Sequence, residues 1–324
     1  DAVRKSFAAS ILISSAVAII TTVFSVLLTR PLLELLQTPA EIIDDATAYL
    51  VIIFLGIPAT ILFNLLSNAV RALGDSKTPL YFLIFACCVN IVLDLVFILY
   101  LHLGVAGAGI ATILSQLLSG ILCIFFIIKK VPILRLKKAD FQIHYEVIAS
   151  HLSIALPMAF QMSIIAIGSL MLQFALNGLG AASVAAYTAS QKIESIATMP
   201  LGSFGTAMAT YAAQNYGAGK ISRIRKGVFQ CILMSGSFSI LSGAINVVAG
   251  SQLTSIFVGS QETEVLSLSH TYLVISGCFY FALALLFIYR FTLQGLGKSF
   301  IPTVAGVMEL IMRAIGALVL TGAF

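Results

Sequence analysis

The sequence "LGDSKTP" at residues 73–79 is echoed by "LGKSFIP" at residues 296–302, 223 positions further along the chain. A second pair, "YLVI" at 49–52 and at 272–275, has the same offset. Each copy stands at the same place relative to a long apolar stretch. Matches that share one offset and one position relative to a predicted helix indicate an internal duplication.

The composition places the apolar stretches in a membrane. Hydrophobic residues make up 60% of the chain and charged residues only 10%, with a mean hydropathy of +1.06, whereas soluble domains carry about 25% charged residues. A helix of about 20 apolar residues crosses the roughly 30 Å of hydrocarbon in a bilayer. We therefore predict an all-α polytopic membrane protein with nine spans, at 8–29, 48–70, 79–100, 105–128, 152–177, 182–213, 227–249, 268–293 and 301–323.

The repeat offset then predicts the architecture. Spans one to three correspond to spans seven to nine, so the repeat unit has six helices, and the two copies share one orientation. We therefore expect a 6+6 two-lobe plan, of which this chain lacks helices 1, 2 and 12. Residues 1–128 form the N-terminal lobe, 129–150 a linker and 151–324 the C-terminal lobe.

The net charge of +5 is explained by orientation rather than by nucleic-acid binding. All but one of the lysines and arginines near span ends lie on one side, with Arg290 counted among them, and only Arg30 lies on the other. By the positive-inside rule the basic side is cytoplasmic. We expect a multi-pass protein of the inner (plasma) membrane, with the linker 129–150 in the cytoplasm and no nucleic acid as partner.

Asp94 is the most informative polar residue within a span. Placing Asp near the middle of a membrane helix costs on the order of 2.5–3.5 kcal/mol. Asn90 lies one turn away on the same helix face. Counting outward to the connection near residue 103 puts Thr112, on the next span, at the depth of Asp94. A carboxylate, an amide and a hydroxyl together suit Na⁺, or a protonatable carboxyl.

Asp94 has a simpler alternative role, which is to cap or bond a neighbouring helix. The repeat places Ala317 where the first copy has Asp94, so the helix position does not itself require an acid. Glu309 and Arg313, four residues apart, are expected to neutralise each other. A further set of polar and flexible side chains is expected to line a cavity: Gln161, Met162, Lys192, Met199 and Tyr280.

Enzymatic chemistry is not indicated by the sequence. The chain carries no phosphate-binding GKS or GKT loop, no HExxH and no GxSxG motif. We therefore expect no enzyme activity and no cofactor, and any energy for transport would come from an ion gradient.

Three motifs resemble those of the multidrug and toxic compound extrusion (MATE) family: "RALGDSKTP" at 71–79, "AAQNYGAGK" at 212–220 and "IALPMAFQ" at 154–161. The resemblance implies twelve helices in two lobes and efflux of amphipathic, often cationic compounds in exchange for H⁺ or Na⁺. It also implies a cation site at Asn90, Asp94 and Thr112, completed by an acid on helix 1. Another branch of the family carries acids on the helices that correspond to spans 152–177 and 268–293. These two spans contain no Asp or Glu here, which favours the DinF-like branch without an ion site in the C-terminal lobe.

Two alternatives remain open at this point. One is a flippase of the same superfamily that moves lipid-linked oligosaccharides, which would need several basic groups in its cavity. The other is a membrane scaffold without transport activity. In each case the partners are the lipid bilayer and, for the transporters, small molecules, and we expect a monomer.

Overall fold

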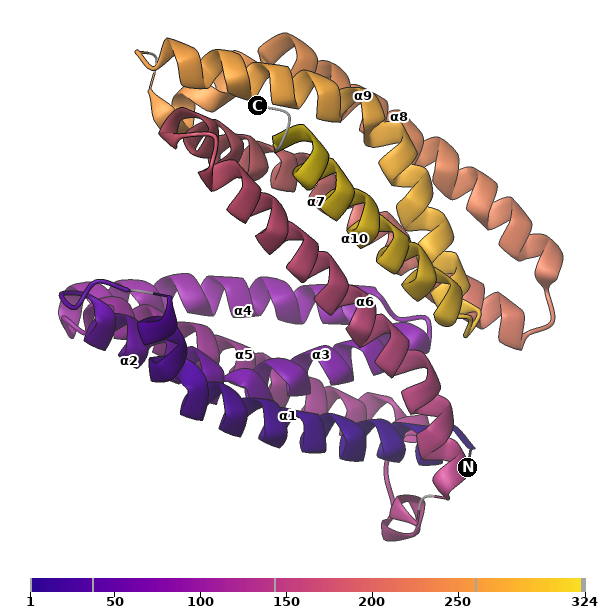
Figure 1. The fold of residues 1–324 in the computed structure, drawn as a ribbon. Coiled ribbons are helices and arrows are strands. Elements are labelled where there is room, and N and C mark those ends of the chain that lie inside the picture. Colours follow the sequence, from indigo (N-terminus) through magenta and orange to yellow (C-terminus); the bar gives the residue numbers. More distant parts are fainter. Residues whose placement is uncertain (1, 37, 143, 260, 322–324) are drawn as a thin grey trace. The chain divides into compact units, whose positions relative to one another are not determined.

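The computed structural model describes all residues except 1, 37, 143, 260 and 322–324 (Figure 1). The described chain is helical throughout and divides into two compact units, Asp1–His151 and Leu152–Phe324. We describe each unit by itself.

The first unit is built from five helices and three short helical turns. They are α1 (Ala2–Leu35), α2 (Ile43–Leu55), α3 (Ile57–Ala72), α4 (Lys77–Leu95) with the π-helical turn η1 (Val96–Tyr100), α5 (Gly104–Lys130), and the 3₁₀ turns η2 (Pro132–Leu134) and η3 (Lys138–Phe141). The helix α6 (Tyr145–Asn177) begins in this unit and continues into the second.

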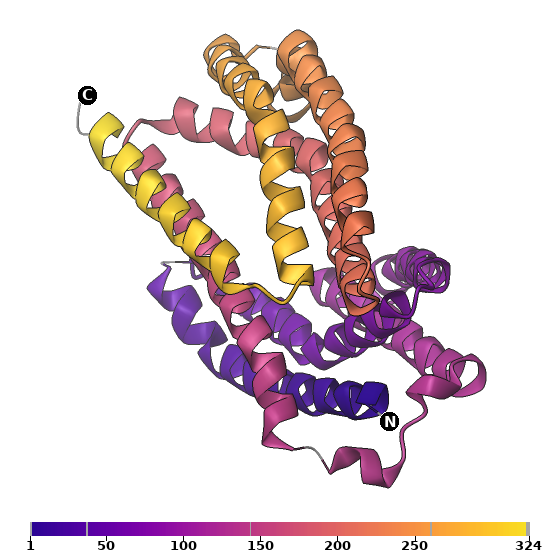
Figure 2. The same ribbon diagram turned by 90° about the vertical axis from the view of Figure 1, so that its right-hand side faces the viewer.

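The second unit contains most of α6 and four further helices. These are α7 (Ala181–Gly217), α8 (Ile221–Val258), α9 (Thr263–Gly295) and α10 (Phe300–Thr321). Helices α7, α8 and α9 pack against one another, whereas α10 lies beside α6 (Figure 2).

The predicted spans fall on these helices, and most helices extend beyond the predicted ends. Eight described segments are long and apolar enough to cross a membrane. The expected count of nine includes 182–213, which lies on α7 and is outside this set. Helix α7 is 37 residues long, but Lys192, Glu194 and many Ala, Ser and Thr residues lower its hydropathy. Residues 322 and 323 of the last predicted span lie outside the described part of the chain.

One predicted span is broken in two. Helix α2 ends at Leu55 and α3 begins at Ile57, with Pro58 in its first turn. Proline is tolerated there because the first N–H groups of a helix have no partner within the helix. The side chain of Ile113 from α5 packs at Gly56, where no side chain stands in its way. By contrast, α6 and α7 continue as helices through Pro157 and Pro200, respectively.

The segment between α5 and α6 is attached to the first unit. The linker expected over 129–150 is shorter, because α5 continues to Lys130 and α6 begins at Tyr145. Within it, the Asp140 carboxylate accepts the backbone N–H of Lys137 at 2.8 Å and lies 3.3 Å from Arg4 of α1. The Lys137 N–H and the Arg4 charge hold the pKa of Asp140 below its ordinary value.

Buried hydroxyl groups connect the three packed helices of the second unit. Ser269 of α9 lies 2.6 Å from the hydroxyl of Ser190 on α7 and 2.7 Å from that of Thr254 on α8. All three side chains are fully enclosed. Small residues also let α8 and α9 approach closely, because a Cβ placed on Gly243 would lie 2.5 Å from the carbonyl oxygen of Gly277.

The close approach of Gly243 to Gly277 leads to a prediction about stability. Gly243→Ala should destabilise the protein by roughly 1–3 kcal/mol, because the new methyl meets rigid backbone and the helices must move apart. The matched control is Gly316→Ala in α10, where an added Cβ meets no atom within 4 Å. That change should be neutral or stabilising by roughly 0.5–1 kcal/mol. Thermal unfolding in detergent measures both, and equal effects would contradict the packing.

A pH-dependent contribution is expected at the start of α4. Asp75 accepts the hydroxyl of Thr78 at 2.6 Å and the N–H groups of Thr78 and Lys77 at 3.0 and 3.1 Å. The Thr78 hydroxyl, followed by its N–H, lowers the pKa of Asp75 below the ordinary value. The stabilisation is therefore complete above the unfolded pKa of about 3.9 and is lost as the pH falls through the lower folded pKa.

The substitution Asp75→Ala should accordingly cost about 1 kcal/mol at pH 6, and less at pH 3, where the wild-type carboxylate is becoming protonated. Melting temperatures of wild type and variant across this range provide the measurement. A difference that stays constant with pH would show that the carboxylate charge does not contribute.

Candidate functional site

Two of the three residues of the expected ion site lie within hydrogen-bond distance of each other. The Asn90 side-chain amide on α4 donates to the Thr112 hydroxyl on α5 at 3.5 Å. The Thr112 hydroxyl in turn donates to the backbone carbonyl of Ala108, at 2.9 Å. The amide and the hydroxyl are thus oriented by a short chain of hydrogen bonds across the α4–α5 hairpin.

Asp94 lies one turn from Asn90 on α4 and is half-buried. Its Oδ1 is enclosed and, among the described residues, has no hydrogen-bond partner. An unpaired carboxylate oxygen withdrawn from water is costly. A bound proton or a small cation would remove that cost.

The register of the hairpin differs from the expected one. We expected Asp94 and Thr112 at equal depth, but Thr112 contacts Asn90, and Gly107 packs at Phe97. The hairpin also contains the π-helical turn η1, in which the Leu101 N–H donates to the Val96 carbonyl, five residues back. A π-helical turn places more residues in a given length than an α-helix does. Residues of α4 therefore lie closer to the connection between η1 and α5 than they would in an uninterrupted α-helix.

The candidate ligands around Asp94 are few. Among the described residues, no group of three or more His, Cys, Asp and Glu is placed to hold a metal ion. Asp94 would supply one carboxylate, and the amide and hydroxyl neighbours would supply uncharged oxygens. Divalent cations usually recruit more carboxylates than this.

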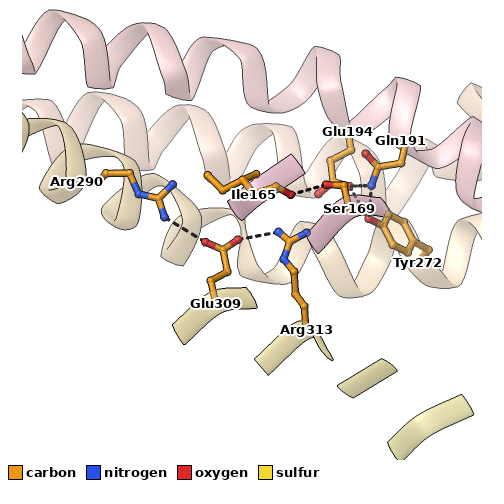
Figure 3. A network of polar contacts seen from close by, with 8 residues as sticks. All are labelled: Ile165, Ser169, Gln191, Glu194, Tyr272, Arg290, Glu309 and Arg313. Carbon is orange, nitrogen blue, oxygen red and sulfur yellow. Dashed lines mark hydrogen bonds and ion pairs between the residues drawn. The ribbon is translucent and has the colours of Figure 1, made fainter. Parts of the chain in front are cut away.

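The second unit contains a polar cavity that the sequence did not predict. Its volume is about 910 Å³, and its walls come from α6, α7, α9 and α10. Two groups of polar side chains face it (Figure 3), and they contain the following residues: Gln191, Glu194 and Tyr272 in one, and Arg290, Glu309 and Arg313 in the other.

The first group holds the carboxylate of Glu194. Tyr272 of α9 donates its hydroxyl to Glu194 Oε2 at 2.6 Å, and Gln191, one turn away on α7, donates its amide at 3.3 Å. The Gln191 amide also donates to the Tyr272 oxygen at 3.0 Å. The Lys192 ammonium lies elsewhere, 5.4 Å from the centre of the Phe257 ring. Both donors to Glu194 are therefore neutral.

The second group is an ion-pair triad between α9 and α10. Glu309 accepts from Arg313 at 2.8 Å and from Arg290 at 3.2 Å. The expected Glu309–Arg313 pair is confirmed. Arg290, grouped from the sequence with the basic residues near span ends, lies within α9 with only 8% of its side chain exposed and is paired with Glu309.

The side chains expected to form a cavity wall do not line this cavity. Gln161 is fully buried and accepts a hydrogen bond from Gln294, while Tyr280 is buried and accepts one from Asn246. Both face neighbouring helices instead of the cavity. The remaining three are exposed: Met162, Lys192 and Met199.

One sequence signal for the missed site was present. Glu194 and Gln191 are three residues apart and share a face of a predicted span, and no basic residue stands three or four positions from Glu194 to neutralise it. An acid in a span without a partner on its own helix needs one on another helix. The partner, Tyr272, is 78 residues away in sequence, and no local pattern identifies it.

The helical units, the membrane-length segments and the oxygen-lined polar sites define the chain as a polytopic helical membrane protein. The sequence profile of the MatE family matches residues 1–96 and 157–319. The chain belongs to this family.

Relatives and solved structures agree with the assignment. The chain is 38% identical to the probable multidrug resistance protein YpnP of Bacillus subtilis (strain 168) over 201 residues, 61% of this chain and 44% of YpnP. It is 27% identical to YoeA of the same organism, also named a probable multidrug resistance protein, over 92% of this chain and 65% of YoeA. The chain therefore spans less than two thirds of the length of these relatives.

A solved structure shows the same fold. An outward-facing MATE transporter of the MOP superfamily superimposes with a TM-score of 0.91 at 18% sequence identity, over 99% of this chain and 76% of that one. The identity is low, so this likeness concerns the fold alone.

The triad predicts two unequal mutational effects. Glu309→Gln should destabilise the protein by about 3 kcal/mol, because it leaves the buried Arg290 without a counter-charge. Arg313→Gln should lower the stability of the protein by about 1 kcal/mol or less. The Arg313 side chain is 38% exposed, and Glu309 still forms its ion pair with Arg290 in this variant. Thermal unfolding of both variants provides the measurement, and a larger cost for Arg313→Gln would contradict this ranking.

Proposed function

We propose that the chain is part of a secondary active multidrug efflux antiporter. It would export amphipathic, cationic compounds in exchange for H⁺ or Na⁺ by alternating access, with no enzyme chemistry and no cofactor. The names of its relatives support multidrug export, and membership of the MatE family supports transport. The observation that carries the ion-coupling proposal is the enclosed, unpartnered oxygen of Asp94.

Asp94 is proposed to exchange the coupling ion. When the ion is bound, the charge of the carboxylate is compensated and the surrounding helices can close around it. When the ion leaves, the carboxylate needs water or a new partner, which favours a more open arrangement. A ligand drives a conformational change only by its difference in affinity between two states, and a single uncompensated charge provides such a difference.

Asn90 and Thr112 are proposed to complete the site. Because the Asn90 amide N–H₂ group faces Thr112, its carbonyl oxygen is directed away from that hydroxyl and is available as a ligand. Orientation by hydrogen bonds lowers the entropic cost of forming the site. Any acid from a segment outside this chain would add to these three groups.

The cellular setting is part of the same proposal. Ion-coupled efflux requires an energised membrane, so we place the protein in the inner membrane, as a monomer with the segment 129–150 on the cytoplasmic side. The basic residues at that end agree with this orientation.

The test uses the full-length protein in proteoliposomes loaded with a fluorescent cationic dye. Either a Na⁺ gradient or a pH gradient is imposed, and dye movement is followed for wild type and Asp94→Asn. We expect the variant to lose gradient-driven movement down to the level of protein-free vesicles, because the amide carries no charge to be compensated. The gradient that drives the wild type identifies the ion.

The control is Asp45→Asn, which changes an acid in the first turn of α2. It should transport as the wild type does. Undiminished gradient-driven transport by Asp94→Asn would remove this residue from the coupling mechanism.

A further inference from the structure

The cavity of the second unit has two electrically different sides. On one side stands Glu194, whose described hydrogen-bond donors, Tyr272 and Gln191, are uncharged. No described residue forms an ion pair with Glu194, so its negative charge is uncompensated. The rings of Tyr187 and Tyr272 meet edge to face beside it, with centroids 5.6 Å apart. Aromatic faces beside a carboxylate suit an organic cation.

The other side of the cavity carries a net positive charge. Two guanidinium groups share the single carboxylate of Glu309. Arg290 is almost fully enclosed, whereas 38% of the Arg313 side chain is exposed. Arg313 is therefore the member of the triad that can donate further hydrogen bonds to a bound anion, and planar guanidinium suits carboxylate in particular.

The internal repeat shows how this site differs from the one at Asp94. At the offset of 223 residues, Arg313 stands where the first unit has Asn90, and Ala317 stands where it has Asp94. The same position on corresponding helices, α4 and α10, thus carries a neutral amide in one unit and a cation in the other. Four residues further along, the first unit carries the acid Asp94 and the second carries the apolar Ala317.

The dimensions and walls of the cavity suit a drug-sized molecule. Its volume of about 910 Å³ lies within the range of roughly 300–1,000 Å³ found for ligand pockets. The rest of the lining includes apolar side chains, among them Ile165 and Leu170 of α6 and Leu283 and Phe287 of α9. A lining that combines apolar side chains with opposite charges favours an amphipathic ligand that carries both charges.

We propose that this cavity binds a dipolar aromatic molecule, with its cationic group at Glu194 and its carboxylate at Arg313. That such a molecule is also carried across the membrane rests on the proposed function; the binding itself does not.

The probes are two dyes that differ in one group. Rhodamine 110 carries a delocalised cation and a free carboxylate, and rhodamine 123 is its methyl ester. Binding to the purified full-length protein in detergent is followed by fluorescence anisotropy, with protein-free micelles as the blank. We expect the wild type to bind rhodamine 110 about tenfold more tightly than the ester, which corresponds to one charge-assisted hydrogen bond.

Two substitutions separate the two sides of the cavity. Arg313→Gln should abolish the preference for the free carboxylate and leave the affinity for the ester within twofold. Glu194→Gln should lower the affinity for both dyes about tenfold, because both dyes carry the cationic group that is proposed to bind at Glu194. The amide oxygen of Gln can still accept from Tyr272, and melting temperatures verify that each variant is folded.

Arg225→Gln and Glu264→Gln, at exposed positions outside the cavity lining, should leave both affinities unchanged. Because dye binding is measured in detergent without an ion gradient, a failed transport experiment and a failed binding experiment can be told apart. The proposal is overturned if neither dye binds saturably, if wild type does not distinguish them, or if Arg313→Gln keeps the preference.

Discussion

The cost of a charge in an apolar environment is the constraint on which the polar organisation of this protein depends. Water is not available to the middle of a membrane-length helix, so each charged side chain needs a partner inside the protein. Glu309 meets this requirement with two arginines, while the described donors to Glu194 are neutral. Asp94 has one enclosed oxygen that no described residue contacts by a hydrogen bond. The two proposed binding sites are at the carboxylates whose negative charge is not balanced by a described cationic side chain.

The two units show that a repeated helical framework does not require repeated chemistry. The motif "LGDSKTP" begins α4 with the carboxylate of Asp75 bound to Thr78, whereas Lys298 stands at the corresponding place before α10. Tyr49 packs near Gly109 in the first unit, while its counterpart Tyr272 donates to Glu194. The two copies thus share sequence motifs at corresponding places, whereas the polar contacts made there differ.

The features predictable from the sequence are those that depend on neighbours along one helix. Apolar runs predicted the helices, and the four-residue spacing of Glu309 and Arg313 indicated their ion pair. The pairing of Arg290 with Glu309 was not predicted, because the two residues lie on different helices.

The parts of the site that could not be predicted depend on the rotation and register of whole helices. Gln161 and Tyr280 looked like cavity residues because of their polarity, but they bond to Gln294 and Asn246 on adjacent helices. The meeting of Glu194 with Tyr272 requires the relative positions of α7 and α9. Hydrophobic periodicity contains little of this information when helices are apolar on every side.

The π-helical turn η1 has a geometric consequence for the hairpin that holds Asp94. Each residue of an α-helix advances by about 100° around the axis, since there are 3.6 residues per turn. One additional residue in the π-helical turn Val96–Tyr100 therefore rotates the side chains before the turn by about that angle relative to the side chains after it. The end next to the connection can keep its packing against α5, while α4 on the other side of η1 directs its side chains around the helix axis in a different direction.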